Sequence, residues 1–448
     1  MKTAAGAGVV ALALCGATVA AQAPTAHSLG DAVAQAAQTA AAPARTITLT
    51  QALAMARTNS PELAAAAATV GTAQATRADA RSALLPSLRF NSSYIYTQPN
   101  GTPTGVFTAN NGENEYIDQA NVHSGVGVAE AAGLRSANAA LAAARAEAAI
   151  AQRGLVYTVV QRYDAMVVAE RKLATAGTAL QTAQRFAAIT RDRERGGEAA
   201  QADVIKADIT VQQRQRELRE AELALHTGQN ELAIVILPAY DTNFAVADDL
   251  AEPAPLPPFA SVQTQAERNN PALAAAAASL RQADQDIWVA RGEILPSVSF
   301  DYFYGLDSNQ FAATVDGYRN LGSSVVASLN VPLWNWGATG AHIAAARLRA
   351  AQAQIGLSFA ARQLQADMHS FYEEAQAARE ELDSLKQSVD LASESLRLTT
   401  LRYQAGEANV LEVVDAQTTL TDAQNAHDDG LARYHLALAN LQTLTGIL

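Results

Sequence analysis

Cysteine is almost missing from this sequence: among 448 residues, Cys15 is the only one. One thiol cannot form an internal disulfide, and a chain without Cys15 would have no thiol chemistry at all. Leu14 precedes Cys15, where a lipidation site normally has a small residue, so the sequence disfavours acylation without deciding it. The sequence therefore predicts a chain without disulfides.

Concentrated positive charge is also missing. The formal net charge is −12, and no run of lysine and arginine occurs anywhere in the chain. Because binding to the phosphates of DNA or RNA needs a dense basic face, this balance excludes nucleic acid as the main partner.

Motifs for catalysis, metals and nucleotides are missing as well. The seven histidines are scattered without an HExxH pair, and His427 and His435, eight residues apart, are typical of ordinary helix positions. Gly125 and Gly127 lack the further glycine that a phosphate loop needs, and no GxSxG elbow occurs. The sequence predicts no enzyme, no cofactor and no metal site.

Long apolar runs are confined to the start of the chain. Lys2 is followed by an apolar stretch from Ala4 to Ala21 and by small residues up to Ala23, the pattern of a cleaved export signal. We expect residues 1–23 to be this signal and residues 24–45, rich in Ala, Gln, Thr and Pro, to form a poorly ordered leader. No later run reaches about 18 apolar residues, which excludes a membrane-spanning helix.

What the chain does contain is an internal repeat. The stretch Asn59–Phe90 returns 210 residues later as Asn269–Phe300 without a gap, and 15 of the 32 positions are identical. Internal repeats decide the architecture before any other signal does. The sequence predicts a tandem duplication, with one repeat at 46–237, a proline-rich connector at 238–258 and a second repeat at 259–448.

Long stretches without proline predict helices in both repeats. Alanine supplies much of the 49% apolar content, while aromatic residues reach only 6%, a mixture that favours close-packed helices over a thick globular core. Gly197 and Gly406 interrupt these stretches and predict turns. Helices are expected at 49–84 with a break near Pro61, at 133–195 and 201–237, and in the second half at 259–295, 337–404 and 408–445.

Between the helices, apolar and polar residues alternate with the period of a strand. The expected strands are 87–96, 121–129, 297–306 and 324–333. Strands of about ten residues are long enough to cross a bilayer on a tilt. Four strands cannot close a membrane barrel, and open edges are not tolerated in lipid, so several copies of the chain must close it together.

The strands alone leave a second interpretation open, in which two small solvent-exposed hairpins cap the helices. Tyrosine and tryptophan side chains favour the boundary between lipid and water. Residues of this kind lie near the strand ends and favour the membrane interpretation: Tyr94, Tyr96, Tyr302, Tyr304, Trp334 and Trp336.

The order of these features resembles the TolC family of outer-membrane efflux proteins, or outer membrane factors. The resemblance is carried by the export signal, the duplicated Leu-Pro-Ser between helix and strand, the segment Val331–Gly337 (VPLWNWG) and the segment Tyr403–Gln417 (YQAGEANVLEVVDAQ). It implies a mainly α-helical homotrimer in the cell outer membrane. Each protomer gives four strands to one twelve-stranded transmembrane β-barrel, which continues into a long coiled-coil tunnel in the periplasm.

The resemblance also implies partners and an acidic mouth. The partners are a periplasmic adaptor protein, an inner-membrane transporter and outer-membrane lipid. Glu412 and Asp415 match acidic positions that narrow the family's tunnel at its periplasmic end, and their spacing of three places them on one helical face. Taken alone, the same two residues are a solvated acidic helix start, which favours the helix dipole.

A gate at this mouth is implied by Asp203 and Tyr403, which match a pair that links the two helical turns. A basic residue that the family often has nearby is replaced by Ala408. Arg193, Arg195 or Lys206 would have to take over its link.

The predicted function is the passive, gated exit duct of a tripartite efflux or secretion system. The alternative from another class is a soluble periplasmic coiled-coil scaffold or adaptor, whose hairpins bind a partner instead of lipid. Cell fractionation separates the two, because only the duct belongs in the outer membrane.

Overall fold

The computed structural model describes residues 45–97, 113–250 and 254–446. Thr46–Leu448 form one compact unit, and the elements below belong to it, except that β1 begins one residue earlier at Arg45. The expected export signal at 1–23 lies outside the described residues, as do residues 24–44 of the expected leader.

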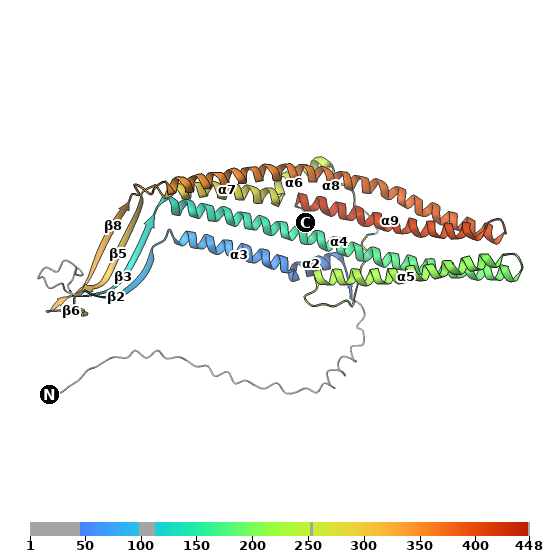
Figure 1. Cartoon of the computed structure of the whole chain (residues 1–448), viewed down its shortest axis with the longest axis horizontal. Coiled ribbons are helices and arrows are strands. Elements are labelled where there is room, and N and C mark those ends of the chain that lie inside the picture. Colours follow the sequence, from blue (N-terminus) through green and yellow to red (C-terminus); the bar gives the residue numbers. More distant parts are fainter. Residues whose placement is uncertain (1–44, 98–112, 251–253, 447–448) are drawn as a thin grey trace, which may run out of the picture. The chain divides into compact units, whose positions relative to one another are not determined.

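The first half of the unit places helices on both sides of a β-hairpin (Figure 1). Its helices are α2 (Leu49–Asn59), α3 (Pro61–Ser82), α4 (Val128–Arg195) and α5 (Gln201–Ile236). The expected break near Pro61 is confirmed. The Ser60 hydroxyl accepts a hydrogen bond from the Leu63 amide (3.3 Å), and Pro61 takes the first helical position, where its missing N–H leaves nothing unpaired.

Helix α4 begins at Val128 rather than at the expected Gly133, and the strand before it ends at Val126. Val128 continues the alternation of the strand, which is why the sequence placed the boundary too late. The alanine-rich residues 129–132 have high helix propensity and already join the helix.

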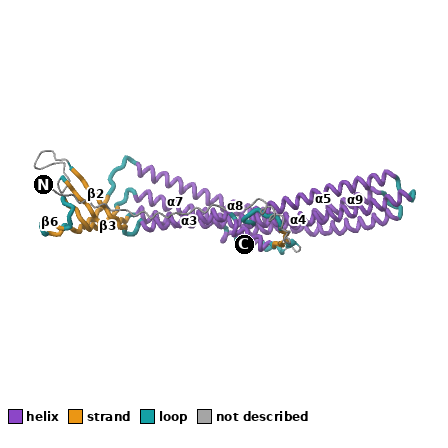
Figure 2. Tube along the Cα trace, turned by 90° about the horizontal axis from the view of Figure 1, so that it is seen from below, coloured by secondary structure: helices purple, strands orange, loops and turns teal. Residues whose placement is uncertain are grey.

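The second half has the same order of long elements. Its helices are α6 (Phe259–Asn269), α7 (Pro271–Gly292), α8 (Ala338–Gln404) and α9 (Val410–Thr445). Helix α5 runs beside α4 and α9 beside α8, while α7 packs against both α4 and α8 (Figures 1 and 2). No helix within the described ranges has both the length and the apolar character to cross a membrane.

Four strands form one antiparallel sheet, at the opposite end of the long helices from their turns (Figure 1). Their order is β2 (Ser87–Tyr96), β3 (Asn114–Val126), β5 (Ser297–Ser308) and β8 (Leu321–Asn330). The register sets Leu88 beside Val122, Val122 beside Tyr302 and Tyr302 beside Val325. The apolar sides of all four strands therefore share one face.

Three strand predictions were wrong at their boundaries, although β5 differs only by ending at Ser308 instead of residue 306. Strand β3 starts at Asn114 instead of residue 121, because Asp118 interrupts the apolar alternation while pairing with β2 continues as far as Tyr96. Strand β8 covers 321–330 instead of 324–333, because Pro332 has no N–H to donate and ends the ladder.

Two short strand pairs were not predicted. Strands β6 (Thr314–Val315) and β7 (Tyr318–Arg319) are joined by Asp316 and Gly317, both at positive φ, the Asp-Gly loop that suits a tight hairpin. Strand β1 (Arg45–Ile47) pairs with β4 (Phe244–Val246), which lies inside the expected connector. The Tyr163 hydroxyl donates to the Ala247 carbonyl (2.7 Å) and ties this pair to α4.

Candidate functional site

The two helical turns are built alike. We call residues 190–203, around the turn between α4 and α5, the first tip, and residues 399–412, around the turn between α8 and α9, the second tip. Gly197 and Gly406 adopt φ near +80° (78° and 81°), a left-handed conformation that glycine adopts without strain. The amides of Glu198 and Glu407 then reach back to the carbonyls of Arg193 and Arg402 (2.8 Å each) and end both helices.

Tyr403 is buried where the two tips meet, with only 4% of its surface exposed. Its ring packs on Phe186 with the centroids 4.9 Å apart, and its hydroxyl lies 3.2 Å from the Thr190 Oγ1. Val410 and Val413 at the start of α9 complete this apolar cluster. Helices from both halves of the chain are thereby joined at the tips.

Arg193 makes a second link between the tips. Its guanidinium lies over the Tyr403 ring, 4.9 Å from the centroid, and donates a hydrogen bond to the Tyr403 carbonyl. The ring face attracts the cation, and the carbonyl is one of the unpaired acceptors at the end of α8. Of the three basic residues expected to compensate for Ala408, Arg193 is the one that spans the tips.

Asp203 has a different place from the one implied for a gate pair. Its carboxylate accepts a hydrogen bond from the Ala200 amide (3.3 Å) and caps the start of α5. In the described part of the chain no hydrogen bond joins Asp203 to Tyr403, whose hydroxyl is engaged by Thr190. Within one chain, the structure does not bring the expected pair together.

Glu412 and Asp415 lie one turn apart at the start of α9. Glu412 accepts from the Asn409 amide (3.2 Å), while the Asn409 side chain accepts from the Glu412 amide (3.0 Å), a complete capping box. The Glu412 carboxylate also lies 3.4 Å from the Arg402 guanidinium. Asp415 is exposed, and within the described residues its carboxylate has no ion pair.

The sheet presents two chemically different faces. Large apolar side chains stand exposed on one of them, with Leu88 at 75% and Phe90 at 70% of their full surface. Tyr94, Tyr302 and Tyr304 belong to the same face, as the register shows. A soluble protein rarely leaves an apolar area of this extent uncovered, so this face is a contact surface.

Aromatic residues lie at both ends of that apolar face. Tyr94 and Tyr96 end β2 at the side away from the helices, and Tyr94 packs on Tyr116 with centroids 5.0 Å apart. Trp334 and Trp336 follow β8 on the helix side, edge to face with centroids 5.8 Å apart, and both are exposed. Tyr302 and Tyr304, which the sequence placed near a strand end, lie instead in the middle of β5 on the apolar face.

The opposite face of the sheet is polar. His123 Nδ1 lies 2.8 Å from Asp301 Oδ1, and the Asn121 amide donates to the same oxygen (3.2 Å). No group of three or more His, Cys, Asp or Glu side chains in the described ranges is arranged to hold a metal ion.

Comparisons with known proteins bear on the family and on the fold. The family model described as outer membrane efflux protein matches residues 52–236 and 262–447. The pyoverdine export outer membrane protein OpmQ of Pseudomonas putida is 29% identical to this chain over 398 residues, covering 84% of the chain and 81% of the relative. The outer membrane protein TolC of Vibrio cholerae is 26% identical over 409 residues, covering 88% and 89%.

Solved structures have the same fold. The outer membrane protein VceC of Vibrio cholerae matches with a TM-score of 0.77 at 19% identity, covering 89% of this chain and 96% of that one. A membrane protein from Pseudomonas aeruginosa matches with a TM-score of 0.78 at 21% identity, covering 89% and 90%.

Proposed function

The chain belongs to the outer membrane efflux protein family, and we propose from this premise that three copies of it close one passive duct, gated at its periplasmic end. The resemblance inferred from the sequence is confirmed. The implied function and localisation are also confirmed: the protein is the exit channel of an efflux system and lies in the outer membrane, with a long periplasmic part. Family membership favours this function over the soluble scaffold.

One observation carries the proposed assembly. Helix α7 packs between α4 and α8, whereas α3, its counterpart in the first half, packs extensively only against α4. The flank of α3 that packs against no other described helix is therefore available to the α8 of a second copy. Helix α8 exposes a stripe of large apolar residues that suits this contact, namely Leu348, Ile355 and Phe359 at 72%, 67% and 59%.

The sheet supports the same arrangement. Strands β2 and β8 are its two edges, each with one neighbour. Unpaired edges carry free N–H and C=O groups that lipid cannot satisfy. Pairing β8 of one copy with β2 of the next satisfies them, and three copies give a twelve-stranded barrel with the apolar face in lipid. Tyr94 and Tyr96 then lie at one boundary of the lipid, and Trp334 and Trp336 at the other.

The two tips form the proposed gate. In a trimer, Glu412 and Asp415 would bring six carboxylates around the axis, where they repel one another and attract cations. The contacts of Tyr403 with Thr190 and Arg193 hold the two tips of one copy together, and Asp203 stands at the same mouth. The duct has no energy source, so a periplasmic adaptor and an inner-membrane transporter are its proposed partners.

The proposal is tested with purified full-length protein. We expect native mass spectrometry to give the mass of three chains, and planar lipid bilayers to show discrete cation-selective conductance steps. A monomer in detergent, or protein that leaves bilayers impermeable, would overturn it. Fractionation of the producing cells checks the place independently of assembly.

A further inference from the structure

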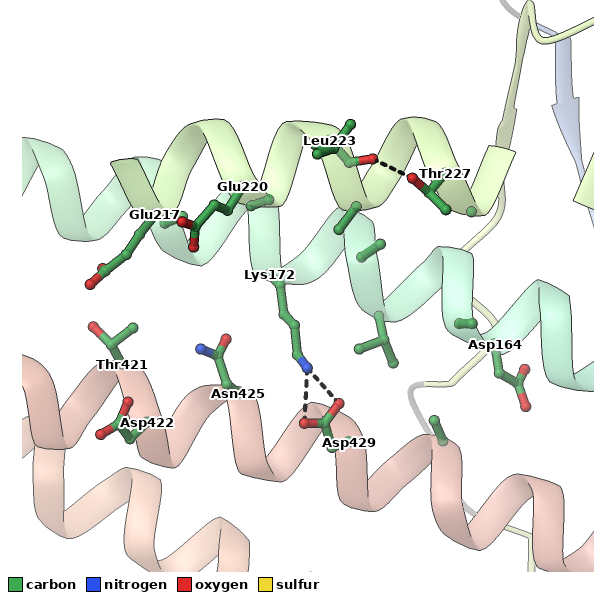
Figure 3. A pocket seen from close by; sticks show the side chains of 18 of the residues that line it. Asp164, Lys172, Glu217, Glu220, Leu223, Thr227, Thr421, Asp422, Asn425 and Asp429 are labelled. Atoms are coloured by element: carbon green, nitrogen blue, oxygen red, sulfur yellow. Dashed lines mark hydrogen bonds and ion pairs between the residues drawn. The ribbon is translucent and has the colours of Figure 1, made fainter. Parts of the chain in front are cut away.

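Four long helices lie in a row in the half of the unit that ends at the tips. Helix α5 packs along α4, α4 packs along α9, and α9 packs along α8. A cavity of about 1120 Å³ lies over α4 between α5 and α9, so these two helices contact each other only sparsely (Figure 3). Helices α5 and α8 are therefore the two ends of the row, as β2 and β8 are the two edges of the sheet.

Helix α5 leaves one side open. Exposed residues follow one another along this side at spacings of three and four, the pattern of a single helical face. Ile205 and Ile209 near the first tip are 55% and 54% exposed, and Arg216 and Arg219 are exposed above them. A groove runs along the same side. We call this set of residues the α5 stripe: Ile205, Ile209, Gln212, Arg216 and Arg219.

The charge of the α5 stripe is positive and uncompensated. Neither Arg216 nor Arg219 has an ion pair among the described residues. Asp208, beside the stripe, is paired with Arg191 of α4. Glu220 lies toward the other side of α5, where it lines the cavity. The stripe therefore has an apolar end near the tip and two free cations above it.

Helix α8 has a face of the opposite charge at the other end of the row. Lys386 is the one exposed cation between residues 373 and 390, and the half-buried Arg379 reaches only Asp383 (3.3 Å). Asp390 has no ion pair in the described part of the chain. Exposed leucines follow the acids toward the second tip. We call this face, which covers about 100° of the helix, the α8 stripe: Glu373, Glu380, Asp383, Asp390, Leu391, Leu398 and Leu401.

The charges of the two stripes lie at matching heights. Helix α5 begins and α8 ends at the tips, so height can be counted from there. At about 1.5 Å per residue, Arg216 lies about 22 Å above the start of α5, and Asp390 about 21 Å above the end of α8. Arg219, at about 27 Å, lies between the heights of Asp390 and Asp383. Two antiparallel helices in contact would therefore bring these opposite charges together.

The apolar ends of the stripes match as well. Ile205 and Ile209 lie about 6 and 12 Å above the start of α5. Leu401 and Leu398 lie about 5 and 9 Å above the end of α8. Apolar side chains therefore face apolar ones near the tips, and cations face acids above them.

We propose that the α5 stripe of one copy packs on the α8 stripe of the next copy, and that opposite charge selects this pairing. The inference rests on the proposed function, because it needs the copies to stand side by side. There, α8 packs higher up against α3 of the next copy, and α3 and α5 both flank α4. The contact of the stripes therefore continues the proposed upper contact toward the tips. The upper contact is apolar, whereas salt screens the charges of the lower one.

A helix of a partner protein is the other occupant that the stripes admit. Two observations favour a second copy. The stripes belong to the two ends of one row, and closing a tube covers both ends at once. Their charges are opposite at equal heights, which a match between one stripe and an unrelated helix does not explain.

The experiment links two differently tagged copies of the full-length chain, produced together in a Cys15→Ser background. One copy carries Gln212→Cys and the other Leu391→Cys, which leave the charges of both stripes intact. The axes of packed helices lie about 8–10 Å apart, a distance that a short bismaleimide spans. We expect a linked product that contains both tags. Glu222→Cys, exposed on α5 away from the stripe, is the matched control and should not link to Leu391→Cys.

Charge reversal tests the selection. Arg216→Glu with Arg219→Glu in the first copy should lower the yield of the link about fivefold or more at low salt, because two attractive pairs become repulsive. Asp383→Lys with Asp390→Lys in the second copy should restore the yield. A variant that merely failed to fold would not be rescued in this way.

Native mass spectrometry separates failure of the contact from failure of the duct. Absence of trimers overturns the proposed function. Trimers without the link, or trimers in which a bulky soluble maleimide labels Gln212→Cys as fast as Glu222→Cys, overturn the contact alone and leave the α5 stripe to a partner protein. A link whose yield ignores charge reversal overturns the selection by charge.

Discussion

Helix α3 and helix α7 begin in the same way and end up in different surroundings. Each has 22 residues and a proline at its first position, and the side chains of Ser60 and Asn270 accept hydrogen bonds from amides three residues on (3.3 and 3.0 Å). Yet α7 buries four of its residues, while α3 buries none. Local sequence determines the cap, whereas burial depends on the neighbours of a helix. Among the described elements, α3 lacks the second neighbouring helix that α7 has.

The tips show the same contrast on a smaller scale. Arg193 and Arg402 both stand four residues before the turn glycine of their tip. Arg402 stays within its own tip, where it contacts Glu412 and the Glu407 carbonyl (3.4 and 3.2 Å). Arg193 instead crosses to Tyr403 in the other tip. The arginine of the first half therefore contacts the second half, whereas the equivalent arginine of the second half makes no contact with the first half among the described residues.

The largest expected effect comes from removing the neighbour that we assign to α3. Ile355→Glu together with Phe359→Glu would bury two charges per copy in an apolar contact, at a cost of several kcal/mol for each ion. We expect trimers to be lost entirely in native mass spectrometry. Gln354→Glu adds a charge beside the stripe and should assemble normally. If the double variant still forms trimers, the stripe on α8 is not the surface that packs against α3 of the next copy.

The next prediction compares Arg193, which contacts the other tip, with Arg402, which contacts only its own tip. Arg193→Ala removes a cation–π contact and a hydrogen bond between the tips, together roughly 1–3 kcal/mol, which corresponds to about a tenfold shift toward the open state. Single-channel recording should show that increase in open fraction. Arg402→Ala is the matched control and should leave it nearly unchanged, since its contacts stay within one tip. Equal effects of the two variants would contradict a one-directional link.

A smaller effect concerns charge at the mouth. Where the second tip is followed by Asp415, the equivalent position after the first tip holds Lys206. Glu412→Gln with Asp415→Asn should lower cation selectivity by a few-fold at low salt, and less at high salt because of screening. Lys206→Gln should shift the reversal potential in the opposite direction. Shifts of the reversal potential with the same sign in both variants would contradict the proposal that Glu412 and Asp415 line the conduction path.

Much of this fold could be read from the sequence because its signals are local. Proline and its cap fix the break at Ser60, glycine fixes the turns, and alternation locates the strands. Strand β4 was missed because three residues are too short for a period, and the start of β3 because Asp118 interrupts one.

The contacts of Tyr403 could not be read in this way. Thr190 and Arg193 are 213 and 210 residues away from it, and no local pattern reports such a distance. The family pattern offered Asp203 as its partner, but in this chain Asp203 caps its own helix. Three basic residues were candidates for the link, and only the packed tips single out Arg193.

Two histidines on α9 give the smallest and most local comparison. His435 lies 2.7 Å from Asp164 on α4, and this hydrogen bond, with the charge of Asp249 nearby, raises the pKa of His435 above its ordinary value. Burial separately raises the pKa of Asp164 above its ordinary value. A raised histidine pKa means that the folded state holds the proton more tightly. Its stabilisation is complete below the ordinary histidine value of about 6.5 and is lost as the pH rises through the raised pKa.

His427, by contrast, is 3.9 Å from its closest carboxylate oxygen, on Asp428. We therefore expect the midpoint of the far-ultraviolet melt to fall by roughly 2 °C more in the wild type than in His435→Gln between mildly acidic and mildly alkaline pH. This corresponds to about 1 kcal/mol for a partly exposed charged hydrogen bond. His427→Gln should behave like the wild type. If the two variants melt alike across this pH range, the contact of His435 with Asp164 gives no pH-dependent stabilisation. Both histidines would then be ordinary helix residues.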